Sequence, residues 1–169
     1  MKKEAKKYAG SIVLGINDAL IELTGALAGL TLALQNNKII VITGLITGIA
    51  ASLSMAASEY LSTKAEITNY KKIIKRKPII ASFYTGIAYF ITVLILILPY
   101  LLLTNVYYSL IWTMINALII IFLFTFFLSI EKGQPFYHRF IEMVLISFGI
   151  AAISFCVGYI LKIFVSVEI

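Results

Sequence analysis

Five long apolar stretches constrain the fold of this sequence more than any other feature. About 20 apolar residues in a helix cross the hydrocarbon of a bilayer. The stretches that meet this condition cover about residues 8–34, 39–62, 79–103, 106–130 and 140–165. Because 61% of the 169 residues are hydrophobic and only 13% are charged, a soluble domain would have too little interior to bury them. The sequence therefore predicts an all-α, polytopic membrane protein with five transmembrane helices.

The breaks between these stretches carry turn chemistry. Residues 35–38 form a short polar break, Pro78 suits the first position of a helix, and polar or Gly/Pro-containing segments occupy residues 104–105 and 131–135. No linker or low-complexity segment divides the chain. We therefore expect residues 1–169 to form a single transmembrane domain.

The basic residues are distributed unevenly between the two sides that these spans define. Twelve of the 14 Lys and Arg residues fall in the N-terminal arm, the 62–79 connection or the 130–140 connection, and only Lys38 and Lys162 fall on the other side. The positive-inside rule then predicts a cytoplasmic N-terminus and, after an odd number of spans, a C-terminus outside the cell membrane. The same pattern explains the net charge of +6 without nucleic acid.

Several function classes lack the residues that they require. The chain has one Cys and one His, which excludes an internal disulfide and a Cys/His metal cluster. It shows no nucleophile–base pair, phosphate-binding loop or nucleotide motif. We expect neither an enzyme nor a bound cofactor.

Three carboxylates lie inside the predicted spans, where each costs about 2.5–3.5 kcal/mol to insert and is a functional candidate. Asp18 and Glu22 are in the first span and Glu59 is in the second. The spacing i, i+4, i+7, i+11 places Asp18, Glu22, Gly25 and Gly29 on one stripe, and a second stripe carries Gly44, Gly48, Met55 and Glu59. Both stripes therefore combine carboxylates with a pair of small residues that lets helices approach closely.

Counting from the short turn places Asp18 and Met55 at the same depth, with Glu59 about 6 Å further toward the cytoplasm. Asp18, Met55 and Glu59 are thus predicted to surround one point, with Glu22 about 6 Å outward of Asp18. Carboxylates with one thioether suit a divalent transition metal such as Fe²⁺ or Mn²⁺. Two other readings remain open at this stage: the acids hold helices together, or they form a path for protons alone.

Two segments carry a resemblance to a known family. Residues 17–30 read NDALIELTGALAGL and residues 53–62 read LSMAASEYLS. Together they resemble the vacuolar iron transporter family, which has a D-G-type motif in its first span and an S-M-A-x-G-E-[FY]-x-S motif at the end of its second. Ala19 and Ser58 stand where many members have Gly.

The resemblance implies a five-span dimer that carries Fe²⁺ or Mn²⁺ out of the cytosol, in exchange for protons. It also implies metal-binding roles for Asp18, Met55 and Glu59, whereas the family motif does not clearly cover Glu22. Some members carry a long acidic metal-collecting insert after the second span. Here residues 65–77 are basic, with Glu66 as their only acid, so we expect no such storage domain.

The sequence thus predicts an exporter of Fe²⁺ or Mn²⁺ that exchanges metal for protons at Asp18, Glu22, Met55 and Glu59. We expect a homodimer through the first span, formed by Gly25 and Gly29, because two copies would double the carboxylates along one path. The alternative function is a non-transporting membrane interaction protein whose acids only stabilise helix packing.

Overall fold

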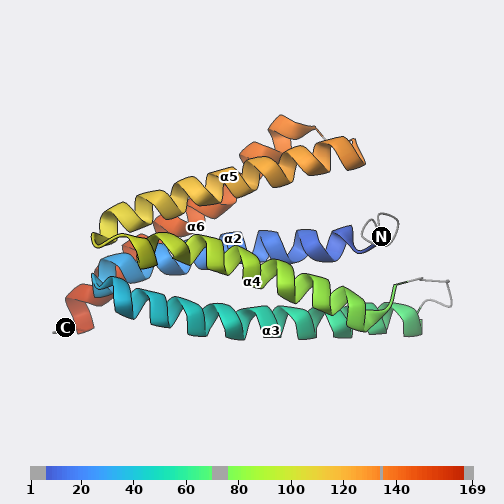
Figure 1. The fold of residues 1–169 in the computed structure, drawn as a ribbon, viewed down its shortest axis with the longest axis horizontal. Helices are drawn as coiled ribbons and strands as arrows, with labels where there is room; N and C mark the ends of the chain where they lie inside the picture. The colour runs from blue at the N-terminus through green and yellow to red at the C-terminus, as the bar shows by residue number, and fades with distance from the viewer. Residues whose placement is uncertain (1–6, 70–75, 134, 166–169) are drawn as a thin grey trace.

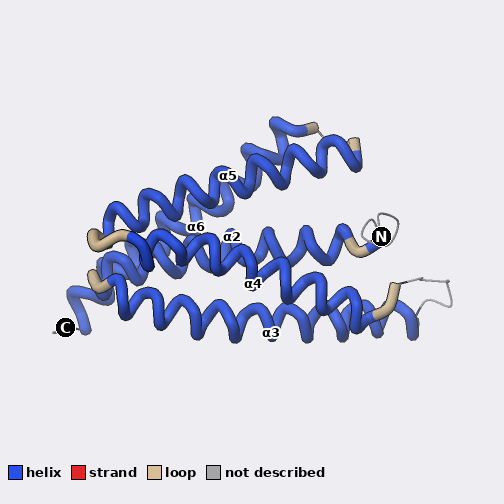
Figure 2. Tube along the Cα trace, viewed as in Figure 1, coloured by secondary structure: helices blue, strands red, loops and turns tan. Residues whose placement is uncertain are grey.

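The computed structural model describes residues 7–69, 76–133 and 135–165, and within these ranges it contains helices and short connections but no strand (Figures 1 and 2). The helices are α2 (Ala9–Leu34), α3 (Asn37–Asn69), α4 (Pro78–Leu102), α5 (Val106–Lys132) and α6 (Phe136–Val165). All five are long and apolar enough to cross a membrane. The predicted all-α, multi-pass membrane fold is therefore confirmed.

Consecutive helices reverse direction, so the two ends of the chain lie at opposite ends of the bundle (Figure 1). Two helices extend beyond the predicted spans by more than three residues at one end. α3 continues to Asn69 rather than residue 62, and α6 begins at Phe136 rather than residue 140. The 33 residues of α3 extend about 50 Å, which exceeds the hydrocarbon thickness of about 30 Å. The predicted bounds followed hydrophobicity, but a helix continues past the membrane surface until a residue interrupts it.

The predicted breaks form turns stabilised by identifiable residues. Gln35 ends α2 with a φ of 51°, and the side-chain oxygen of Asn36 accepts hydrogen bonds from the backbone N–H groups of the first turn of α3. Asn105 caps α5 in the same way, and Gly133 ends that helix with a φ of 63°. These caps satisfy backbone groups that would otherwise be unpaired at the helix ends.

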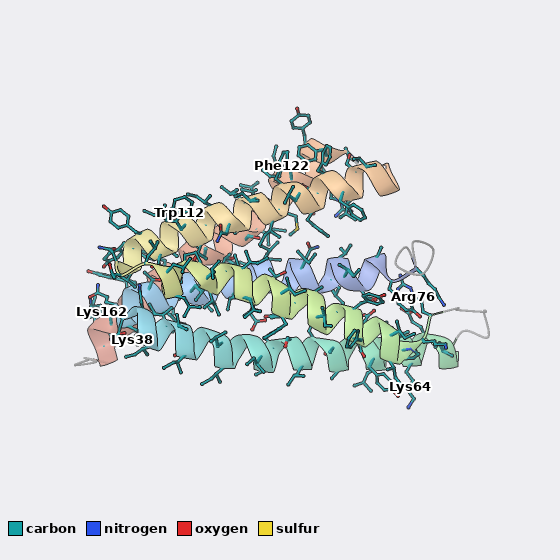
Figure 3. The ribbon with its side chains drawn as sticks, viewed as in Figure 1. Lys38, Lys64, Arg76, Trp112, Phe122 and Lys162 are labelled. Carbon is teal, nitrogen blue, oxygen red and sulfur yellow. The ribbon has the colours of Figure 1, made fainter. Side chains whose placement is uncertain are left out.

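Basic side chains mark the two ends of the bundle (Figure 3). Lys64 and Arg76 lie at the end where α2 begins, which we call the basic end, whereas Lys38 and Lys162 lie at the opposite end (Figures 1 and 3). Arg76 also fixes the start of α2, because its Nε donates a hydrogen bond to the carbonyl oxygen of Lys7. The arrangement agrees with the charge asymmetry of the sequence.

α2 occupies the centre of the bundle and packs mainly against α4 and α6. Its buried face contributes Leu20, Leu23 and Leu27 to a core shared with Tyr89 and Leu96 of α4. The two helices approach closely at Gly15, where an added Cβ would overlap the carbonyl oxygen of Thr85. The absence of a side chain at this glycine therefore allows direct backbone contact between α2 and α4.

α4 also packs against α3, so it contacts both α2 and α3 near this depth. Gly86, the residue after Thr85, faces α3, where an added Cβ would lie 3.1 Å from the Cβ of Ala56. Further along α3, an added Cβ at Gly48 would lie 2.5 Å from a methyl group of Val93. The predicted small pair Gly44 and Gly48 thus accommodates α4 rather than α2 alone.

Gly15 provides a direct test of this packing. We expect Gly15→Ala to lower the stability of the purified protein by about 1–3 kcal/mol, because the new methyl group must push the two backbones apart. The measurement is the thermal unfolding midpoint in detergent. Gly149→Ala is the matched control, since nothing lies within 4 Å of an added Cβ at this helical glycine. Equal midpoints for the two variants would contradict the close α2–α4 contact.

Candidate functional site

Asp18 and Glu22 lie on the outward-facing side of α2, well inside its 26 residues. Glu22 is exposed and Asp18 is half-buried. They are one helical turn apart, which corresponds to a rise of about 6 Å. Neither carboxylate forms an ion pair with a Lys, Arg or His among the described residues. Two uncompensated acids therefore lie on one stripe of a membrane-spanning helix.

A tyrosine from another helix holds Glu22. The Tyr89 hydroxyl of α4 donates a hydrogen bond of 2.8 Å to Oε2 of Glu22. Tyr89 itself is fully buried among Leu20, Leu23 and other core residues. The carboxylate that faces outward is thus fixed by a side chain anchored in the core.

Glu59 is held in a similar way, at a different depth. Its Oε1 accepts a hydrogen bond of 2.6 Å from the hydroxyl of Ser11, which is buried on α2. The backbone carbonyl of Ser11 in turn accepts a hydrogen bond of 3.0 Å from Thr85 of α4. Ser11 therefore connects Glu59 of α3 to the contact between α2 and α4.

The hydrogen bond between Glu59 and Ser11 places Glu59 further from the level of Asp18 than the sequence predicted. Ser11 is seven residues before Asp18 on α2, so Glu59 lies about 10 Å from the level of Asp18 rather than the predicted 6 Å. Within the described ranges, no three His, Cys, Asp or Glu side chains come close enough to hold one ion. The prediction took the relative level of α2 and α3 from their turn alone, whereas α4 packs against both of these helices as well.

Met55 lies between these levels, one helical turn from Glu59 on α3. Its side chain is partly buried and packs against the hydrophobic core. In this structure the thioether therefore contributes to packing.

Two further oxygens near the acids differ in their availability. The hydroxyl of Thr24 donates to the backbone carbonyl of Leu20 and is satisfied within its own helix. Asn17, next to Asp18, has a buried side-chain oxygen without a hydrogen-bond partner among the described residues. The Asn17 oxygen is therefore the one that remains free to accept a hydrogen bond or a cation.

Sequence reasoning missed Tyr89 and Ser11 as partners of the acids. Tyr89 had one recognisable signal, because it lies deep inside a predicted span, away from the interfaces where tyrosines usually gather. Ser11 had no such signal, since small hydroxyl residues are common in membrane helices.

Gly25 and Gly29 pack within the chain. An added Cβ at Gly29 would lie 2.8 Å from the carbonyl oxygen of Ser154 on α6, and one at Gly25 would lie 3.1 Å from the Ser154 hydroxyl. On α6, an added Cβ at Gly158 would overlap the carbonyl oxygen of Gly29. The expected homodimer interface at Gly25 and Gly29 is thus wrong in its location, because α6 already occupies that surface.

The remaining ionisable candidates lie near the basic end. Glu142 lies 3.6 Å from Arg139, and both side chains are partly exposed. His138 and Glu66 are exposed as well. None of these side chains lies in a described group of metal-ligating residues.

The comparisons with known proteins agree with the resemblance in the first two helices. Residues 9–79 match the sequence model of the VIT family. This segment includes Asp18, Glu22, Met55 and Glu59, so it contains all the candidate residues described above. No curated protein matches the chain.

The VIT family consists of transporters rather than enzymes, and it indicates a general role in the movement of metal ions across a membrane. The match over residues 9–79 supports membership of this chain in that family, the vacuolar iron transporter family.

Proposed function

We propose that this protein exports Fe²⁺, Mn²⁺ or both from the cytosol in exchange for protons. The observation that carries the proposal is the pair Asp18 and Glu22, two carboxylates without a basic partner among the described residues, inside a helix that matches the family. Charged groups at such a position are costly unless a cation or a proton neutralises them. A metal ion and protons can therefore replace each other at the same oxygens.

The three acids suit successive positions along one path better than a single coordination site. Glu59 lies nearest the basic end, level with Ser11, and would meet the ion first. Asp18 follows about 10 Å deeper, and Glu22 lies one turn beyond it. Met55 lies between Glu59 and Asp18, where its sulfur would favour Fe²⁺ over Mg²⁺ if the side chain turned toward the ion.

A second function is supported by two hydrogen bonds. Ser11–Glu59 and Tyr89–Glu22 each connect two helices, as expected if the acids serve only to stabilise packing in a non-transporting interaction protein. Asp18 forms no hydrogen bond to another helix among the described contacts. Asp18 is therefore the residue that distinguishes the two functions.

We expect Asp18→Asn to fold normally and to reduce metal flux at least tenfold, because the amide keeps the shape but loses the charge that attracts a cation. The measurement is Fe²⁺ or Mn²⁺ flux in proteoliposomes, with and without a pH gradient. The gradient is set so that protons are driven in the direction opposite to metal movement. In the wild-type protein this gradient should accelerate flux.

Glu142→Gln is the control, since that acid pairs with Arg139 near the basic end. Normal flux in Asp18→Asn would discard the assignment of this residue, and equal wild-type flux with and without the gradient would discard proton exchange.

We further propose that a second copy of the chain covers the acidic side of α2. Leu14, Asp18 and Glu22 follow each other at intervals of four residues and form one outward-facing stripe. Carboxylates on this stripe would face lipid in a monomer, whereas two copies would enclose them. The proposed homodimer still forms through the first span, but its contact lies at Leu14 and the acids rather than at Gly25 and Gly29.

Leu14 allows this dimer to be tested by cross-linking. In a Cys156→Ala background, we expect Leu14→Cys to form a disulfide between two chains in native membranes, because its side chain is 39% exposed beside the acids. Leu123→Cys on α5, which is 59% exposed, is the control and should remain monomeric on a non-reducing gel. Cross-linking only at residue 123 would place the interface elsewhere.

Finally, we propose that the basic end faces the cytoplasm and that the protein resides in the cell membrane. In the same Cys156→Ala background, Lys38→Cys should react with a membrane-impermeant maleimide added to intact cells. Lys77→Cys, from the basic end, should react only after permeabilisation. The reverse pattern would invert the proposed orientation and the direction of transport.

A further inference from the structure

Tyr89 and Tyr100 form a natural pair for comparison on α4. Tyr89 is 0% exposed and Tyr100 is 2% exposed. Each hydroxyl makes a hydrogen bond to α2: Tyr89 to the carboxylate of Glu22 at 2.8 Å, and Tyr100 to the hydroxyl of Thr31 at 2.5 Å. The two bonds differ in their partners, because only Tyr89 bonds to a carboxylate.

The position of Tyr89 is determined by packing around it. Its ring belongs to the hydrophobic core, and its backbone N lies 3.1 Å from the position of an added Cβ at Gly15. A side chain in such a close-packed interior has little rotational freedom. The hydroxyl is therefore presented to α2 at a fixed place.

Glu22 is the opposite case, because it is an exposed side chain with several rotatable bonds. An unrestrained glutamate would lose conformational entropy each time it bound an ion. The hydrogen bond from Tyr89 holds Oε2 before any ion arrives and leaves Oε1 available. Such preorganisation increases affinity without adding a contact to the ion.

We infer that Tyr89 is a positioning residue that holds the Glu22 carboxylate for the transported cation. The inference rests on the proposed function and extends it to a residue on α4. Tyr89 itself does not touch the ion. Its hydroxyl sets the affinity of the path at Glu22, and the buried ring supports the core independently of that role.

The test compares Tyr89→Phe with Tyr100→Phe. Both changes remove one buried hydroxyl and keep the ring, so they should have similar effects on the unfolding midpoint. We expect Tyr89→Phe to raise the apparent KM for Mn²⁺ roughly three- to tenfold with little change in maximal flux, as loss of one hydrogen bond predicts. Tyr100→Phe should leave KM unchanged.

Binding of Mn²⁺ to the detergent-solubilised protein, measured by calorimetry, provides a readout that does not depend on transport. In the wild-type background, Tyr89→Phe should weaken Mn²⁺ binding by the same factor as it raises KM. In a Glu22→Gln background, adding Tyr89→Phe should not weaken binding further. A change that persists in Glu22→Gln would show that Tyr89 acts only through packing and would overturn the inference.

The outcomes separate this inference from the function on which it rests. If the wild type transports Mn²⁺ and the two tyrosine variants behave alike, the positioning role is wrong while export stands. If the wild type neither binds nor transports Fe²⁺ or Mn²⁺, the proposed function is wrong and the inference is overturned with it.

Discussion

The backbone contact between α2 and α4 at Gly15 and Thr85 determines most of the arrangement around the acids. It brings the hydroxyl of Thr85 to the carbonyl of Ser11 and sets the depth at which Tyr89 lies beside α2. Because α4 also packs against α3 through Gly86, the same contact sets the level of Glu59 relative to Asp18. The close contact at Gly15 thus influences the relative depths of the acids and their partners on α2, α3 and α4.

Hydroxyl groups, rather than basic side chains, are the partners that the structure shows for the acids in the described helices. Ser11 donates to Glu59 and Tyr89 donates to Glu22. A Lys or Arg at either place would neutralise the carboxylate permanently and compete with a metal ion. A hydroxyl can donate to a carboxylate and accept from a protonated acid, so it remains a partner in both forms. These partners are therefore compatible with an exchange of cations and protons.

α2 packs against α6 as well as α4, and this explains the outcome for Gly25 and Gly29. The sequence identified them as a helix contact but assigned the wrong partner helix. Small residues at Gly25 and Gly29 do allow a close helix contact, as their spacing indicated. The partner is α6 of the same chain, which supplies Ser154 and Gly158 at matching intervals. Spacing on one helix identifies a contact surface, but several helices can satisfy it equally well.

The sequence by itself determined the number of spans, the positions of the turns, the charge asymmetry and the presence of acids inside helices, because each depends on hydrophobicity and local chemistry along the chain. Asn36, Asn105 and Gly133 end or cap helices where their residue types predicted breaks. Only the tertiary structure decided which groups meet. Glu59 lies beside Ser11 and Glu22 beside Tyr89, because α4 packs against both α2 and α3 and contributes to their relative level. The physical reason is that the relative level of two helices depends on the side chains at several interfaces. Counting residues from the turn that joins them cannot include a third helix that packs against both.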